Sequence, residues 1–198
     1  MKTKFDASDI TVLQGLDAVR MRPTMYVGVL DAHTPTLLLG ETLCLGAGGL
    51  GCRERVNIDV RIMHEDGYDA CIVSDDTLGL PRGSAHRLMT QLHACFDEKR
   101  LHETATFCRA GISVMNALSR HCVLEVLNDE HHHVASFMRG HAMQPSEFPP
   151  EEQTGNNLLF IPDSDIIGTS MFDMDSVRAL IASAMHQLPG LTITLEEQ

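Results

Sequence analysis

Cysteine and histidine are the residue types in this sequence that could support metal or redox chemistry. The six cysteines are Cys44, Cys52, Cys71, Cys95, Cys108 and Cys122, and no two of them form a CxxC pair. The close spacing of a metal or redox motif is therefore missing. A reducing compartment keeps isolated cysteines as thiols. We therefore expect all six to behave as small buried apolar residues.

Three consecutive histidines, His131, His132 and His133, stand between two strand-like runs. Neighbouring side chains on an extended backbone point to opposite faces, so the three rings cannot all reach one metal ion. A histidine-rich turn in contact with solvent therefore fits this spacing better than a metal site. We expect no metal centre here.

The composition predicts one globular domain. The chain has 198 residues, of which 43% are hydrophobic and 21% are charged, and this length suits a single domain with a substantial core. The formal net charge of −12 opposes nonspecific binding to the phosphate backbone of DNA, so we expect no direct DNA binding. The longest apolar run, around residues 37–39, is too short to cross a bilayer, and residues 1–5 lack the apolar core of a signal peptide. We therefore expect a cytoplasmic protein that makes no membrane contact.

Periodicity and turn residues predict an α+β order of elements. The first expected helix is capped by Asp6 or Ser8, carries Ile10 and reaches Val19. Further helices are expected at residues 36–45, 84–93, 111–120 and 173–185, and strands at 56–62, 70–74, 122–127, 134–138, 157–161 and 191–195. The glycine-rich run 46–51 should loosen the second helix. Because hairpins outnumber parallel crossovers, the pattern favours a two-layer α/β sandwich over a doubly wound sheet.

Several stretches resemble the ATP-binding domain of the gyrase B and topoisomerase IV B proteins. They are residues 6–28 (DASDITVLQGLDAVRMRPTMYVG), 113–119 (SVMNALS), 154–162 (TGNNLLFIP) and 189–195 (PGLTITL). The match spans almost the whole chain, although Thr24 replaces a glycine of the opening motif. The resemblance implies the Bergerat fold of the GHKL ATPases, with helices packed on one face of a mixed sheet, over residues 1–198 as a single domain.

In the resemblance, Glu41 stands at the position of the family's water-activating acid. Leu45 stands where the family has an asparagine that binds magnesium. Glu41 keeps the acid of the family, but leucine has no oxygen with which to bind a hard cation. Gly49 and Leu78 replace the two members of an ion pair of the family. Replacing both members destabilises a fold far less than replacing one, because no charge is left without its partner. The resemblance therefore implies a less polar pocket without magnesium.

The adenine motif of the family, aspartate-x-glycine-x-glycine, is similar to residues 75–79. Asp75 and Gly79 are retained, whereas Thr77 replaces the first glycine. Asp75 and Asn156 lie where the family contacts adenine and inhibitors that compete with ATP. The resemblance therefore implies a ligand site formed by Asp75, Gly79 and Asn156, with Leu45 and Leu78 as apolar neighbours, and it leaves weak binding of ATP or ADP open.

The phosphate lid of the family corresponds to residues 104–111. Only Gly111 of its glycines remains, and other residues do not freely adopt the positive φ that a phosphate cradle needs. Arg109 could neutralise an anion. The chain also stops where the transducer and DNA-cleavage domains of the family would follow, so the lysine that reaches the terminal phosphate is expected to be absent. Each such electrostatic element contributes about 2.7–4 kcal/mol to a barrier, and we therefore expect no ATPase or topoisomerase activity.

Three functions remain open, and the sequence favours them in the order enzyme, receptor and regulatory partner. An enzyme could use Glu41 and Asp75 as acid and base groups on a small organic substrate, in a pocket that has gained Leu45, Leu78 and Phe107. A receptor could hold a nucleotide or a gyrase inhibitor, as in self-resistance. A regulatory partner could form a homodimer, or contact gyrase itself, through residues 1–10, where Phe5 replaces a tyrosine of the family's dimer arm.

Overall fold

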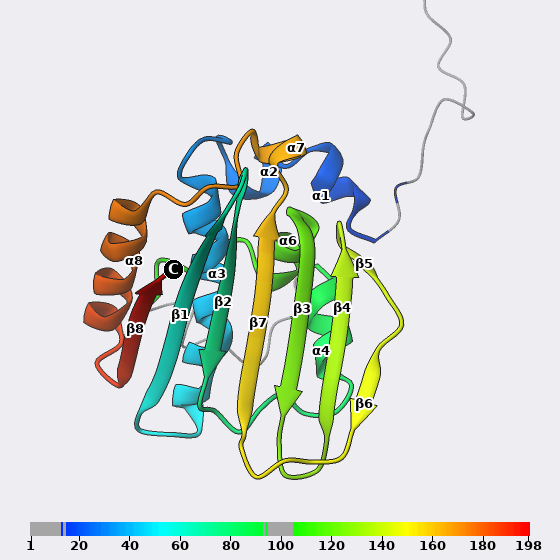
Figure 1. The fold of residues 1–198 in the computed structure, drawn as a ribbon, viewed down its shortest axis with the longest axis vertical. Coiled ribbons are helices and arrows are strands. Elements are labelled where there is room, and N and C mark those ends of the chain that lie inside the picture. Colours follow the sequence, from blue (N-terminus) through cyan, green and yellow to red (C-terminus); the bar gives the residue numbers. More distant parts are fainter. Residues whose placement is uncertain (1–12, 14, 93, 95–104) are drawn as a thin grey trace, which may run out of the picture.

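The computed structural model describes residues 13, 15–92, 94 and 105–198. The sequence-based predictions for Asp6, Ser8 and Ile10, for the arm of residues 1–10 with Phe5, and for Cys95 and Thr104 lie outside these residues. In the described part, one sheet carries helices on a single face, as Figure 1 shows. No helix in it is long and apolar enough to cross a membrane.

The helices and strands alternate in an irregular order along the chain. The helices are α1 (Asp17–Met21), α2 (Thr24–Val27), α3 (Thr34–Ala47), the 3-10 helix η2 (Gly48–Gly51), α4 (Ser84–Thr90), α6 (Ile112–Ala117), α7 (Ser164–Ile167) and α8 (Met174–Gln187). The strands are β1 (Val56–Glu65), β2 (Tyr68–Asp75), β3 (Ser119–Leu127), β4 (His132–Met138), β5 (His141–Ala142), β6 (Ser146–Phe148), β7 (Gly155–Pro162) and β8 (Leu191–Glu197).

The described strands form a mixed sheet in the order β5-β4-β3-β7-β2-β1-β8, with β6 paired to β4. Among the pairs of described strands, only β1–β8 is parallel, and the others are antiparallel. β1 alternates strictly between buried and exposed residues over 56–62, so its apolar side chains point to the helix-covered face. The predicted α+β two-layer arrangement is confirmed.

Two predicted helices end earlier than their sequence pattern indicates. The helix expected at 111–120 stops at Ala117, because Ser119 already pairs with Pro162 of β7 and the Asp163 N–H donates to the Leu118 carbonyl. Likewise, the helix expected at 84–93 ends at Thr90. Strand pairing overrides helix propensity at the first of these boundaries.

The histidine run is not the solvated turn that the sequence predicted. His131 and His132 are buried, and β4 begins at His132. His132 Nε2 lies 2.8 Å from Glu125 Oε1, and its ring lies 5.0 Å from the ring of Phe148. The turn lies instead between Leu127 and His131, where the Asn128 amide oxygen accepts from the backbone N–H of His131 at 2.9 Å. The run therefore helps to anchor β6 to the sheet.

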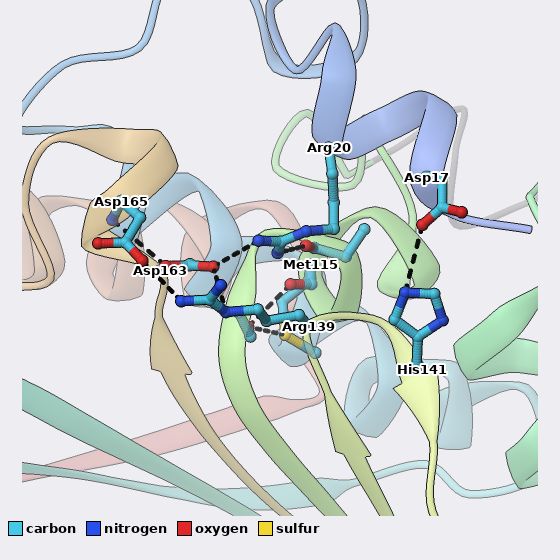
Figure 2. A network of polar contacts seen from close by, with 9 residues as sticks. Asp17, Arg20, Met115, Arg139, His141, Asp163 and Asp165 are labelled. Carbon is cyan, nitrogen blue, oxygen red and sulfur yellow. Dashed lines mark hydrogen bonds and ion pairs between the residues drawn. The ribbon is translucent and has the colours of Figure 1, made fainter. Parts of the chain in front are cut away.

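A buried carboxylate joins the N-terminal helix to the end of β7. Asp163 is 1% exposed, and Figure 2 shows two arginines converging on it from different elements. Arg20 of α1 donates to Asp163 Oδ2 at 2.7 Å and to the Ala117 carbonyl at 2.7 Å. Arg139 lies 3.5 Å from the same oxygen and 2.6 Å from Asp165. The network gives Arg20, a residue of the opening motif, a structural role.

Glycines allow α3 to approach β1 and β2 very closely. A Cβ atom on Gly46 would lie 2.7 Å from Ile58 Cδ1 and 3.1 Å from Asp75 Cβ. A Cβ atom on Gly49 of η2 would lie 2.4 Å from Thr77 Cγ2. Real Cβ atoms do not come this close to other carbons, because interiors are already packed at crystal density. The predicted loosening of the α-helix over the glycine run is confirmed, and the same glycines bring the helix against the end of β2.

We predict that Gly49→Ala destabilises the fold by about 1–3 kcal/mol, the usual range for overpacking. The new methyl group meets the Thr77 methyl group. Thr77→Ser removes that methyl group and keeps the hydroxyl, so the Gly49→Ala/Thr77→Ser double variant should recover part of the loss. Urea unfolding of the four proteins measures this coupling, and additive effects of the two changes would contradict the close contact.

At the turn end of the β1–β2 hairpin, an ion pair joins the two strands. His64 Nδ1 lies 2.9 Å from Asp69 Oδ1. Asp69 is wholly buried, and its Oδ2 accepts from the Phe172 N–H at 2.7 Å. Glu197 lies 3.4 Å from His64 Nε2. The hydrogen bond to Asp69 raises the pKa of His64 above its ordinary value of 6.5, against a smaller opposing effect of burial. The folded protein therefore binds this proton more tightly than the unfolded chain does.

We predict that His64 contributes stability that is fully present below about pH 6.5 and is lost as the pH rises through its raised pKa. The difference in unfolding free energy between the wild type and His64→Gln should therefore shrink from about pH 6 to pH 9. Urea titrations at intervals across this range measure it. A difference that stays constant, or grows with pH, would contradict the assignment.

Candidate functional site

Asp75, Thr77 and Asn156 form a compact polar cluster at the ends of β2 and β7. Asp75 Oδ1 accepts from the Thr77 hydroxyl at 2.5 Å and the Thr77 N–H at 3.1 Å. The Asn156 amide donates to both oxygens of Asp75, at 3.2 and 3.0 Å, and to the Thr77 hydroxyl at 3.1 Å. The side-chain oxygen Oδ1 of Asn156 accepts from the Leu80 N–H at 3.1 Å. The register pair Asp75–Asn156 between β2 and β7 sets this geometry.

The two oxygens of Asp75 are used unequally. Oδ1 receives bonds from the backbone and side chains of both Thr77 and Asn156, whereas Oδ2 accepts one bond from the described residues. Burial raises the pKa of the Asp75 carboxyl, and the hydrogen bonds from Thr77 and Asn156 act in the opposite direction. A half-buried carboxylate with acceptor capacity left on one oxygen can recognise an N–H or O–H donor of a ligand.

Glu41 lies on α3 and is turned toward the segment that precedes α6. Its Oε1 accepts from the backbone N–H groups of Arg109 and Ala110, each at 2.8 Å, and its Oε2 accepts from the Gly111 N–H at 2.9 Å. The side chain is 2% exposed. Gly40 leaves room for this approach, because a Cβ atom there would lie 3.0 Å from the Phe107 carbonyl oxygen. The carboxylate thus fastens residues 109–111 to α3.

Cys44 and Cys108 form a disulfide, which corrects the expectation that all cysteines are thiols. Their Cα atoms are 5.9 Å apart and their positions are separated by 64 residues. The bond joins α3 to the same segment that Glu41 holds. In the chain-entropy account, a cross-link over a loop of this length stabilises a fold by about 4 kcal/mol. Of the other described cysteines, Cys71 and Cys122 are buried thiols, and Cys52 is an exposed thiol.

The remaining predicted residues take simpler positions. Gly79 has φ of 71°, and a Cβ atom on it would strike the Leu127 carbonyl oxygen, so the turn at this position requires glycine. Leu78 is exposed, whereas Leu45 is partly buried against the core. Arg109 is exposed, and its Nε donates to the Thr106 carbonyl oxygen at 2.8 Å.

The site residues predicted from the sequence therefore fall into two groups, and both groups lie next to α3. Asp75, Gly79 and Asn156 gather at the strand ends, whereas Glu41 of α3 contacts Arg109 in the segment before α6. Thr77 is central to the first group, and its spacing two residues after an aspartate is the signal for its hydrogen bond. Within the described residues, no three His, Cys, Asp or Glu side chains are placed to hold a metal ion.

A shallow hollow of about 240 Å³ lies on the uncovered face of the sheet, away from both groups. Its lining includes Asp59, Arg61, Thr194 and Glu196. Arg61 pairs with Glu196 at 3.1 Å, and the Thr194 hydroxyl donates to Asp59. The charged groups of this hollow thus satisfy one another, and it is not the site that the sequence predicted.

Comparison with curated proteins places this geometry in a family. The chain is 30% identical to the DNA gyrase B protein of Thermus thermophilus, 26% identical to that of Mycobacterium tuberculosis and 30% identical to that of Chlamydia pneumoniae. Each match covers 98% of this chain but 26–32% of the relative, so the chain spans about a third of the length of these relatives or less. No protein-family model matches. The matches and the mixed sheet with its helices agree, and the chain is a gyrase B-like domain with the α+β fold typical of GHKL ATPases.

Proposed function

We propose that this gyrase B-like domain is a receptor that binds a small planar molecule through Asp75 and does not hydrolyse ATP. The observation that carries the proposal is the free acceptor capacity of Asp75 Oδ2 in a cluster that is otherwise saturated. A rigid acceptor beside apolar side chains is the usual form of a small-molecule site, in which few polar groups fix the orientation of the ligand. Leu45 and the exposed Leu78 supply apolar surface in this region of the family site.

The same contacts argue against a triphosphate as the ligand. The three backbone N–H groups before α6, which correspond to the family's phosphate lid, already donate to Glu41. Leu45 offers no oxygen for a magnesium ion that would accompany the phosphates. The net charge of −12 adds general repulsion toward polyanions. We therefore favour an uncharged donor-bearing ligand, of the kind represented by ATP-competitive gyrase inhibitors, over a nucleotide.

The geometry gives less support to a repurposed enzyme. A general base must reach a proton on the substrate. The Glu41 carboxylate is 2% exposed and engaged by three backbone donors, which suits a fastening role. Asp75 alone of the two retains an oxygen that can meet a ligand. The regulatory-partner hypothesis depends on residues 1–10, which lie outside the described residues, and so it stays a proposal without structural support.

We predict that an aminocoumarin binds the pure protein and that Asp75→Asn weakens this binding about 10- to 100-fold, the effect of losing a hydrogen bond to a charged acceptor. Isothermal titration calorimetry measures both affinities, with ATP and ADP as competing ligands. Asp66→Asn is the matched control, since Asp66 lies in the exposed turn at the far end of β2. Binding that Asp75→Asn leaves unchanged, or heat from none of the three compounds, would contradict the receptor proposal.

We predict that Glu41→Gln lowers the free energy of unfolding by about 2 kcal/mol or more, because an amide NH₂ group replaces an acceptor that faces backbone donors. Neither the wild type nor this variant should release inorganic phosphate from Mg-ATP above background. Urea unfolding and a phosphate assay measure the two properties, with Glu65→Gln as an exposed control on β1. Magnesium-dependent phosphate release that Glu41→Gln abolishes would overturn the assignment of Glu41 as a fastening residue.

A further inference from the structure

The segment 105–111 is attached to the rest of the fold by hydrogen bonds, by a disulfide and by the buried side chains of Ala105 and Phe107, which pack in the hydrophobic core. Glu41 accepts from its last three backbone N–H groups, and Cys108 is bonded to Cys44. At its start, the Thr106 N–H donates to the Gln187 side chain of α8 at 2.7 Å, a contact exposed to solvent. Exposed hydrogen bonds of this type contribute little to local stability. The disulfide and the carboxylate therefore fix residues 108–111, whereas burial of Ala105 and Phe107 in the core holds the start of the segment.

Both strong attachments originate from one short stretch of α3. Glu41 and Cys44 are three residues apart, so their side chains lie on the same side of the helix one turn apart. They meet residues 108–111, which are consecutive. The disulfide holds Cys108 next to the helix and so keeps the following N–H groups within reach of the carboxylate. Loss of the covalent bond leaves three hydrogen bonds to hold the end of the segment on α3.

We propose that Cys44 and Cys108 form a reversible thiol–disulfide modification site, whose partner is a dithiol reductant, and that reduction loosens segment 105–111 from α3. In the reaction the dithiol gives two electrons and two protons to the sulfurs of Cys44 and Cys108. Their S–S bond breaks, two thiols form, and the dithiol closes to its own disulfide. The exchange proceeds through attack of a thiolate on one sulfur of the bond.

Both cysteines are buried in the hydrophobic core, but the bond joins α3 to the segment before α6. It does not join two strands or close the sheet, and the described sheet pairs without it along its whole register. Reduction should therefore change the segment before α6 and leave the strands intact. Because Glu41 is covered by the same segment, the reduced form would also expose this carboxylate.

Intact mass spectrometry and amide hydrogen exchange of the full chain test the proposal. The non-reduced protein should be two hydrogen atoms lighter than the protein treated with dithiothreitol, and peptide mapping should locate the difference at Cys44 and Cys108. After reduction, amide exchange in a peptide covering residues 105–111 should become about 10-fold faster or more, while exchange in β3 and β7 stays unchanged. Air or glutathione disulfide should reverse both changes.

Variants separate the effect of this disulfide from a general effect of reductant. Cys108→Ser should show the fast exchange without any reductant, and the matched control Cys52→Ser, which changes an exposed thiol, should behave like the wild type. Three results would overturn the inference: absence of the mass difference, unchanged exchange at 105–111 after the bond is shown to be broken, or reduction that occurs only when β3 and β7 also exchange. The last result would make the bond a structural staple.

Discussion

The close contact between α3 and the β1–β2 hairpin is the constraint on which the candidate site depends. Gly46 and Gly49 remove the side chains that would hold the helix away from Ile58 and Thr77. The end of β2 consequently lies against the helix, and the Thr77 side chain fills the space there.

The second organising feature is that the polar groups of the site satisfy one another. Glu41 finds its donors in the backbone before α6, and Asp75 finds most of its donors in Thr77 and Asn156. A buried carboxylate without such partners would be costly, because the desolvation energy of a charge is large. Under the proposed function, these internal hydrogen bonds replace the contacts that magnesium and phosphate would make. What remains open is one oxygen of Asp75.

The sequence predicted most elements correctly and missed the features that depend on distant partners. The alternating residues of β1 carry strong local periodicity, so the existence and type of this strand could be read directly. α3 is buried on nearly all sides, so its apolar run rather than an amphipathic face indicates the helix. The early end of α6 depends on pairing with β7, which no local pattern reveals. The Cys44–Cys108 bond joins positions 64 residues apart, and only the folded geometry brings them together. The same holds for the donors around Glu41, since a carboxylate's partners are invisible in the sequence.

The Arg20–Asp163–Arg139 network also has a consequence for the order of folding. Arg20 and Asp163 are 143 residues apart, and Asp163 is almost fully buried. Contacts between such distant positions carry a large loop-closure cost and form after the local ones. The carboxylate also becomes buried only when the end of β7 and the turn after β4 are in place to supply Arg139. During synthesis, the contact between Arg20 and Asp163 can therefore form only after the end of β7 has left the ribosome.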